Sequence, residues 1–303
     1  MQIGLGIDSR FALPPEGHRR VAREAAKLGY TSLWTPIGTD REPFDVCALW
    51  HEASGLATGI AVVPLSGWRL DTLAGVARET FERCGGRFTL GLGSGRTTIG
   101  PIRLMRDAAA TLRRDAPEMP LYLGALGPQM LRLAGERYDA AALNWCTAEH
   151  VAWSRTEVAS GARRAGRDPS AIALHEYIRV CVDDDVAGAR AAFAKMVMTY
   201  ALARPGADKT KGYRAHFARM GFAEALTNLE RRREAGADDD ELASRFPDEL
   251  LRRVGYWGAS DGARDAFMRL AGGLDTAVVR LVPAGSNDQA AVRRAMEACA
   301  PNG

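Results

Sequence analysis

The sequence has few of the features that direct a chain to a membrane or an oxidising compartment. No apolar segment is long enough to cross a bilayer, and the N-terminal residues lack the basic start and apolar middle of a secretion signal. The five cysteines are an odd number without close pairs, which disfavours both a disulfide framework and a structural zinc site. We therefore expect a cytoplasmic protein whose cysteines are reduced and mostly buried.

The net charge is also small, and the histidines do not form clusters in the sequence. The formal net charge is only +3, and no basic stripe is interleaved with aromatic residues, so neither nucleic acid nor a membrane is an expected partner. The histidines His51 and His150 fall within or at the start of predicted helices and indicate no metal pair. No metal site is therefore expected.

What the sequence does contain is a regular alternation of strand-like and helix-like segments. Hydrophobic residues make up 47% of the 303 residues, which is enough for a large core. Helices are predicted near residues 16–28, 44–53, 71–83, 102–114, 128–135 and 148–165. Strands are predicted near residues 3–8, 32–35, 59–64, 87–93, 121–123, 140–143, 172–182 and 276–282.

The pattern predicts an α/β fold, a single-domain (β/α)8 TIM barrel. Eight strands separated mostly by helices, with apolar runs that lack strict alternation, favour a closed parallel barrel. A helical insertion is expected at about residues 186–253, between the seventh and eighth strands, because no strand-like run occurs there. The alternative is a doubly wound open sheet, but the dinucleotide fingerprint usual near its N-terminus is absent.

A strand runs directly into small residues and a helix start at residues 120–131, Pro-Leu-Tyr-Leu-Gly-Ala-Leu-Gly-Pro-Gln-Met-Leu. Unpaired N–H groups at a helix N-terminus carry partial positive charge, and small residues let an anion approach them. The alternative is an ordinary tight turn with Pro128 near the first helical position. The preceding strand ends in a second glycine-rich stretch, Gly-Leu-Gly-Ser-Gly at residues 91–95, which matches neither a dinucleotide fingerprint nor a P-loop. These two neighbouring strand ends thus predict a binding site in which one cofactor lies between them.

These motifs resemble those of the bacterial luciferase-like monooxygenase superfamily. The resemblance lies in residues 85–95, in residues 122–136 with Leu-Asn-Trp at 143–145, and in residues 258–283. It is nearest to the deazaflavin branch, which uses coenzyme F420 and includes methylenetetrahydromethanopterin reductase.

The resemblance implies a set of cofactor-binding residues. Gly124, Ala125, Leu126 and Gly127 would hold the cofactor phosphate, and Asn144 would reach the polar edge of the ring. Gly91, Gly93 and Ser94 would line the ribityl chain or the ring edge. The third strand, with Ala61, Val62 and Val63, matches the family strand that carries a bulge with a non-prolyl cis peptide behind the ring.

The chain departs from the family pattern at the proton donor. Many relatives place a carboxylate or an Asp-His pair after the second strand, where this sequence has no titratable group. Asp40 follows a few residues later and is the candidate catalytic residue; the alternative is that it caps the next helix. Candidate substrate contacts are Asp8 and three tryptophans that end or follow strands, namely Trp34, Trp68 and Trp145. His175 and Glu176, early in the seventh strand, are interpreted as structural.

The resemblance implies an F420-dependent oxidoreductase that transfers a hydride and reduces a C=C or C=N bond. A short segment between residues 95 and 121 suggests an open pocket, suited to a bulky small-molecule or peptide-like substrate. Two alternatives stay open, an FMN-dependent monooxygenase of the same family and a cofactor-binding protein without catalysis. Dimers are common among relatives, so a homodimer is expected.

Overall fold

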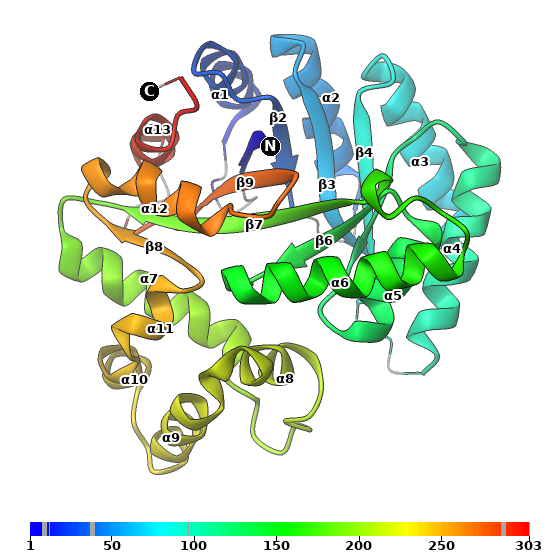
Figure 1. Cartoon of the computed structure of the whole chain (residues 1–303). Helices are drawn as coiled ribbons and strands as arrows, with labels where there is room; N and C mark the ends of the chain where they lie inside the picture. The colour runs from blue at the N-terminus through cyan, green and yellow to red at the C-terminus, as the bar shows by residue number, and fades with distance from the viewer. Residues whose placement is uncertain are drawn as a thin grey trace.

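The computed structural model describes residues 1–7, 11, 13–36, 40–95, 97, 99–285 and 289–302. The strands within these ranges form one parallel sheet in the order β6-β5-β4-β3-β2-β1-β9-β7-β8, and β6 also pairs with β7. The pairings of β9 with both β1 and β7 close a ring from β1 to β7 and β9, while β8 lies outside it. The predicted TIM barrel is confirmed (Figure 1).

The barrel strands match the predicted segments closely, because most of them are short and largely apolar runs. Their bounds are β1 (Gln2–Gly6), β2 (Ser32–Thr35), β3 (Ala57–Pro64), β4 (Phe88–Gly93), β5 (Leu121–Gly124), β6 (Ala140–Asn144), β7 (Ala173–Val182) and β9 (Thr276–Leu281).

The helices that follow these strands pack around the barrel and bury one face each. Proline stands in the first turn of several of them, where its missing N–H has no intrahelical partner to lose. Their bounds are α1 (Pro15–Lys27), α2 (Glu42–Ser54), α3 (Leu70–Arg83), α4 (Pro101–Asp115), α5 (Pro128–Arg137), α6 (Ala148–Arg164), α12 (Ala263–Leu270) and α13 (Gln289–Ala298). No helix of the described ranges is long and apolar enough to span a membrane.

The segment between β7 and β9 holds the helical insertion and one strand that the sequence analysis missed. The insertion comprises α7 (Val186–Ala201), α8 (Gly212–Phe217), a π-helical turn (Ala218–Phe222), α9 (Ala223–Glu234), α10 (Asp239–Arg245) and α11 (Asp248–Arg252). β8 (Gly255–Gly258) then pairs with the last residues of β7, beyond the end of β6. Four residues with glycine at both ends carry no recognisable strand pattern, which is why β8 escaped prediction.

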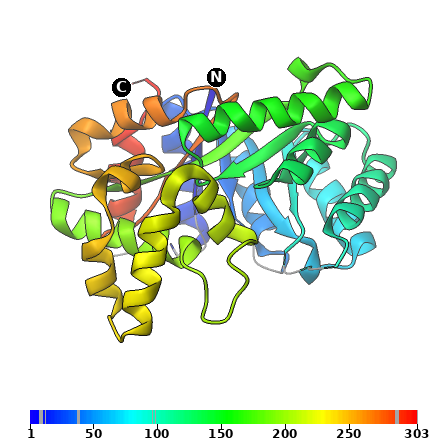
Figure 2. The ribbon, with the colours of Figure 1, turned by 60° about the horizontal axis from the view of Figure 1, so that its bottom comes forward.

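The apolar side chains form separate cores. The largest lies between the barrel strands and the surrounding helices, and a second joins α7 to the rest of the insertion. In Figures 1 and 2 the insertion, coloured yellow-green to orange, lies on one side of the barrel, where α7 contacts β7 and β8. A small third cluster fills the barrel interior around Trp34 and Tyr177. All five cysteines are free and buried, as expected.

Candidate cofactor site

The third strand carries the irregularity that the resemblance implied. The peptide bond between Ala61 and Val62 is cis, and the pairing of β3 with β4 shifts register between Ile60 and Val63. Ala61 and Val63 are buried, whereas Val62 is partly exposed. The bulge therefore turns the Val62 side chain out of the regular pleat.

The glycines of the neighbouring strands make room for Val62. A methyl group added to Gly91 would lie 2.6 Å from the Ile60 carbonyl oxygen, and one added to Gly93 would lie 2.7 Å from Val62 Cγ2. At Gly124 on β5 the added carbon would lie 3.3 Å from both Val62 methyl groups. Larger residues on β4 would thus collide with the bulge. The glycine pattern at 91–93 is explained first by this packing, with Ser94 half-buried at the end of the strand.

The turn after β5 has the open helix end that an anion site needs. Gly127 is the N-cap of α5, no side chain caps the helix, and an added methyl group on Gly127 would meet nothing within 4 Å. Ala125 differs from its neighbours, because its N–H already donates to the Ala142 carbonyl at 3.1 Å and its side chain is buried. Free N–H groups in this turn therefore come from the start of α5.

Arg219 of the insertion contacts the same turn. Its Nη2 donates to the Leu126 carbonyl oxygen at 2.8 Å. Burial lowers the pKa of the Arg219 guanidinium, which nonetheless stays protonated at neutral pH. The sequence analysis missed this residue because the π-helical turn that carries it lies about 90 residues further along the chain, with no motif of its own.

A buried pair of arginines lies at the ends of β7 and β9. Arg179 and Arg280 are neighbours in register and are 3% and 5% exposed. Arg179 Nη1 donates to Asn144 Oδ1 at 2.6 Å, and Asn144 Nδ2 donates to the Tyr213 hydroxyl oxygen at 2.5 Å. Burial, followed by the positive charge of Arg280, lowers the pKa of Arg179 to about 10. Asn144 is thus fixed beside buried positive charge, and the overlooked signal was one arginine in the second half of each of these two buried strands.

Trp34 fills the barrel interior. It is 4% exposed, its Nε1 donates to Ser32 Oγ at 2.8 Å, and its ring stacks on Tyr122 with centroids 5.7 Å apart. His175 also packs against Trp34, with the two ring centroids 4.3 Å apart. The indole therefore forms a floor below the Val62 bulge, which belongs to the same cluster.

The other two tryptophans occupy different surroundings. Trp145 is fully buried, adopts φ 59°, and packs on Phe193 in the core of the insertion, with the Arg179 guanidinium 3.9 Å from its ring centroid. Trp68 follows β3, is partly buried and meets Phe44 edge-on at 5.6 Å. Trp145 has no surface left for a substrate, because its ring is enclosed by protein on all sides; its role as a substrate contact would require the core to open.

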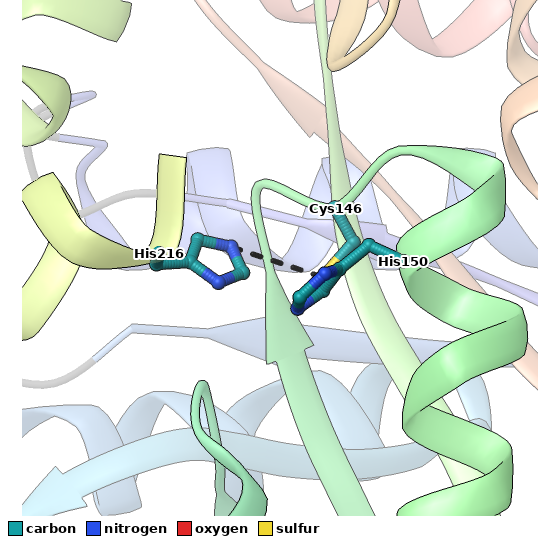
Figure 3. Close-up of side chains that lie close together, drawn as sticks. All are labelled: Cys146, His150 and His216. Atoms are coloured by element: carbon teal, nitrogen blue, oxygen red, sulfur yellow. Dashed lines mark hydrogen bonds between the residues drawn. The ribbon is translucent and has the colours of Figure 1, made fainter. Parts of the chain in front are cut away.

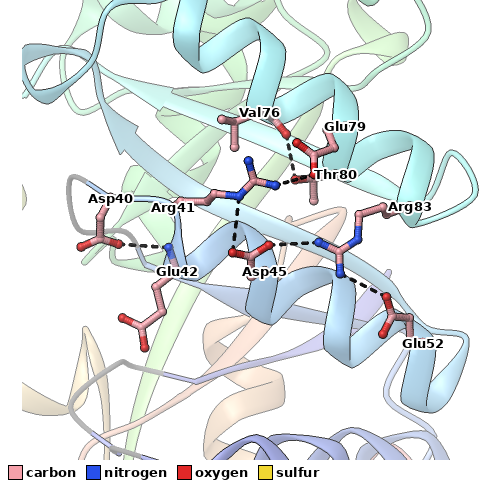
Figure 4. Close-up of polar contacts among 9 residues, drawn as sticks. All are labelled: Asp40, Arg41, Glu42, Asp45, Glu52, Val76, Glu79, Thr80 and Arg83. Carbon is pink, nitrogen blue, oxygen red and sulfur yellow. Dashed lines mark hydrogen bonds and ion pairs between the residues drawn. The ribbon is translucent and has the colours of Figure 1, made fainter.

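Asp40 bonds the start of a helix. Its carboxylate is exposed, and Oδ1 accepts the N–H of Glu42, the first residue of α2, at 3.2 Å from one position before the N-cap Arg41. In Figure 4 Asp40 lies apart from the neighbouring ion pairs, in which Asp45 binds Arg83 at 3.0 Å. The structure thus supports the capping interpretation and leaves a catalytic role as a hypothesis. Asp8, the fourth candidate substrate contact, lies outside the described residues.

The structure thus combines a closed parallel barrel with a bulged third strand and an open helix end after the fifth strand. The sequence profile described as luciferase-like monooxygenase matches residues 100–277, more than half of the chain. The chain therefore belongs to the luciferase-like monooxygenase family.

The chain is similar to several proteins with assigned names. The chain is 33% identical over 100 residues to 5,10-methylenetetrahydromethanopterin reductase of Methanolobus tindarius, a match that covers 33% of this chain and 30% of that protein. It is 23% identical to a Mycobacterium tuberculosis protein that carries the name of a coenzyme F420-dependent oxidoreductase, over 95% of this chain and 96% of that one. The structure of coenzyme F420-dependent tetrahydromethanopterin reductase from Methanopyrus kandleri superposes with a TM-score of 0.77 at 17% identity, covering 99% and 98% of the two chains.

Proposed function

We propose that the protein is a coenzyme F420-dependent oxidoreductase that moves a hydride between the deazaflavin and an organic substrate, reducing a C=C or C=N bond. The observation that carries this proposal is the bulge of β3 between Ile60 and Val63, where glycines of β4 and β5 leave room for the Val62 side chain. Family membership and the names of the relatives support the choice of cofactor.

The phosphate of the cofactor would bind at the turn after β5. The N-terminus of α5 offers uncapped N–H groups, and Gly127 leaves the approach to them open. Arg219, anchored on the Leu126 carbonyl, adds a positive charge at the edge of this turn. Ala125 would help to shape the turn but would donate no hydrogen bond to the phosphate, because its N–H already donates to the Ala142 carbonyl oxygen.

The ring would lie against Val62, above the floor made by Trp34 and Tyr122. When bound, the deazaflavin supplies the hydride-transferring ring carbon. Asn144, held by Arg179, would present its remaining amide N–H to the polar edge of the ring, and the paired positive charges would stabilise electron density that accumulates there on reduction. The chain's own contribution is therefore to fix the ring face, exclude water and tune the charge.

The reduction also needs a proton donor near the ring. Asp40 stands after β2 at the catalytic end of the barrel and is the carboxylate that we propose for this task, with solvent or the substrate as the other sources. A cytoplasmic location and a homodimer, the latter by analogy with relatives, also belong to the proposal. Size-exclusion chromatography with light scattering tests the dimer.

Cofactor titration tests the function. Purified protein is titrated with F420 and with FMN while ring fluorescence is followed, and the reduced complex is then mixed with candidate acceptors in single turnover. The proposal expects tighter binding of F420 and its oxidation by an alkene or imine acceptor. Tighter binding of FMN with oxygen consumption would replace it with the monooxygenase, and F420 binding without turnover by any acceptor would favour the non-catalytic binding protein.

A further inference from the structure

Three potential metal ligands meet behind the turn that follows β5. Cys146 lies in the loop between β6 and α6, His150 in the first turn of α6, and His216 on α8 of the insertion. Their side chains are 6%, 7% and 0% exposed. Figure 3 shows the two imidazoles and the thiol converging from these separate elements.

The spacing of the ligand atoms is close to that of a metal site. One ligand atom from each residue lies within 4.8 Å of the other two. A tetrahedral zinc ion with bonds of about 2.3 Å to sulfur and 2.0–2.1 Å to nitrogen holds its ligand atoms roughly 3.3–3.6 Å apart. The three ligand atoms must therefore approach one another by at most about 1.5 Å to close around the ion.

The hydrogen bonds of the two imidazoles provide an independent observation. His216 Nε2 lies 3.0 Å from the Trp145 carbonyl oxygen. The other ring nitrogen, His216 Nδ1, and His150 Nε2 are both buried and have no partner among the described residues. A buried nitrogen without a partner is costly, and metal-binding histidines show this division, with one nitrogen on a carbonyl and the other on the ion.

The surroundings can admit and balance an ion. His150 lines a cavity of about 370 Å³ together with Thr147, Glu149 and Arg219, so a water molecule can reach the cluster from that side. Glu176 accepts the Cys146 backbone N–H at 2.6 Å and so helps to fix the loop that carries the thiol. The thiolate formed on binding offsets the positive charge of Arg219, which lines the same cavity as His150.

We propose that Cys146, His150 and His216 form a binding site for a thiolate-preferring divalent ion, with Zn²⁺ the best match in ligand type. On binding, the Cys146 S–H bond breaks, its proton goes to solvent, and sulfur and two neutral imidazole nitrogens bond to the ion; no electron is transferred. Water from the cavity takes the fourth position. The ion would tie α8 of the insertion to the barrel loop beside Leu126, and this site stands independently of the proposed oxidoreductase function.

Cobalt titration tests the site, because a thiolate bound to Co²⁺ gives a charge-transfer band in the near ultraviolet. The full-length protein, stripped with a chelator, should develop this band up to one equivalent of Co²⁺, and Zn²⁺ should abolish it. Cys146→Ser should lose the band, and His216→Gln should bind Co²⁺ on the order of tenfold more weakly or worse. The matched controls Cys181→Ser and His51→Gln change a buried cysteine and a histidine outside the cluster, and both should keep the band.

Two results would overturn the proposal. One is the absence of the band in the wild-type protein at saturating Co²⁺, and the other is a band of equal intensity in Cys146→Ser. Thermal unfolding provides a second readout that does not depend on the folding yield of one variant. Zn²⁺ should raise the Tm of the wild type and of both controls, and an equal rise in folded His150→Gln would also contradict the site.

Discussion

Arg219 Nη2 donates to the Leu126 carbonyl oxygen at 2.8 Å, and this contact joins the helical insertion to the turn between β5 and α5. The insertion is thus more than an appendage of the barrel, because it places a guanidinium beside the open N-terminus of α5. The anion-binding interpretation of the turn consequently gains a charged partner that no local motif encodes.

Replacement of this guanidinium should weaken cofactor binding. For Arg219→Ala we expect the dissociation constant of F420 to rise about tenfold, since a hydrogen bond to a charged group contributes about 1.5–3 kcal/mol. Arg219→Lys should lose less, because it keeps the charge. Fluorescence titration measures both, with Arg231→Ala, an exposed change elsewhere in the insertion, as the control. Equal affinities in all three variants would remove Arg219 from the anchor.

Two glycine substitutions should separate folding from binding. Gly91→Ala places a methyl group 2.6 Å from the Ile60 carbonyl oxygen, so we expect it to lower the free energy of unfolding by about 1–3 kcal/mol. Gly127→Ala meets nothing within 4 Å and should change stability little while covering the approach to α5. Urea unfolding and cofactor titration of both variants check this. A stable Gly91→Ala would contradict the tight packing of the bulge.

Asp40→Asn tests the proton donor without disturbing the helix cap. Asparagine also accepts a hydrogen bond from the Glu42 N–H, so the cap and the Tm should persist. If the carboxylate delivers the proton, turnover should fall at least about 100-fold with cofactor affinity unchanged. Steady-state kinetics measure the turnover, and titration measures the cofactor affinity. Unchanged turnover would show that the proton comes from solvent or from the substrate.

The buried histidine of the barrel floor should make the protein acid-sensitive. Burial lowers the pKa of His175 to about 3, against 6.5 in the unfolded chain, so between these values the unfolded state binds more protons. Stability should therefore fall as the pH drops below about 6.5, by about 1.4 kcal/mol per pH unit for this group. Glu176 makes the opposite contribution, because burial raises the pKa of its carboxyl to about 8. Between about pH 4.5 and pH 8 this group adds stability as the pH falls.

The difference between two pH profiles isolates the His175 contribution. Urea unfolding of the wild type and of His175→Phe from pH 4 to pH 7 leaves the Glu176 contribution common to both. The variant should show the smaller loss of stability on acidification. Parallel profiles would show that His175 is not the group responsible.

The sequence by itself determined the barrel. Strand and helix signals are local, so the predicted helices begin within two residues of α1 to α6, and the glycine-rich ends of β4 and β5 were recognisable from their composition. The position of the bulge on β3 followed from the resemblance. Among the described strands, β8 was missed, because a four-residue strand on the outer part of β7 depends on its partner rather than on its own pattern, and the helices α12 and α13 were not predicted either.

The tertiary structure decided what each side chain does. Trp34 and Trp145, predicted as substrate contacts, are enclosed in two different cores, and the sequence has no means to tell an aromatic wall from an aromatic core. The neighbours Arg179 and Arg280, and Cys146 with His216, are separated by 101 and 70 positions in the chain. Such contacts exist only after the barrel closes and the insertion folds against it, because neither local propensity nor periodicity encodes which distant residues come together.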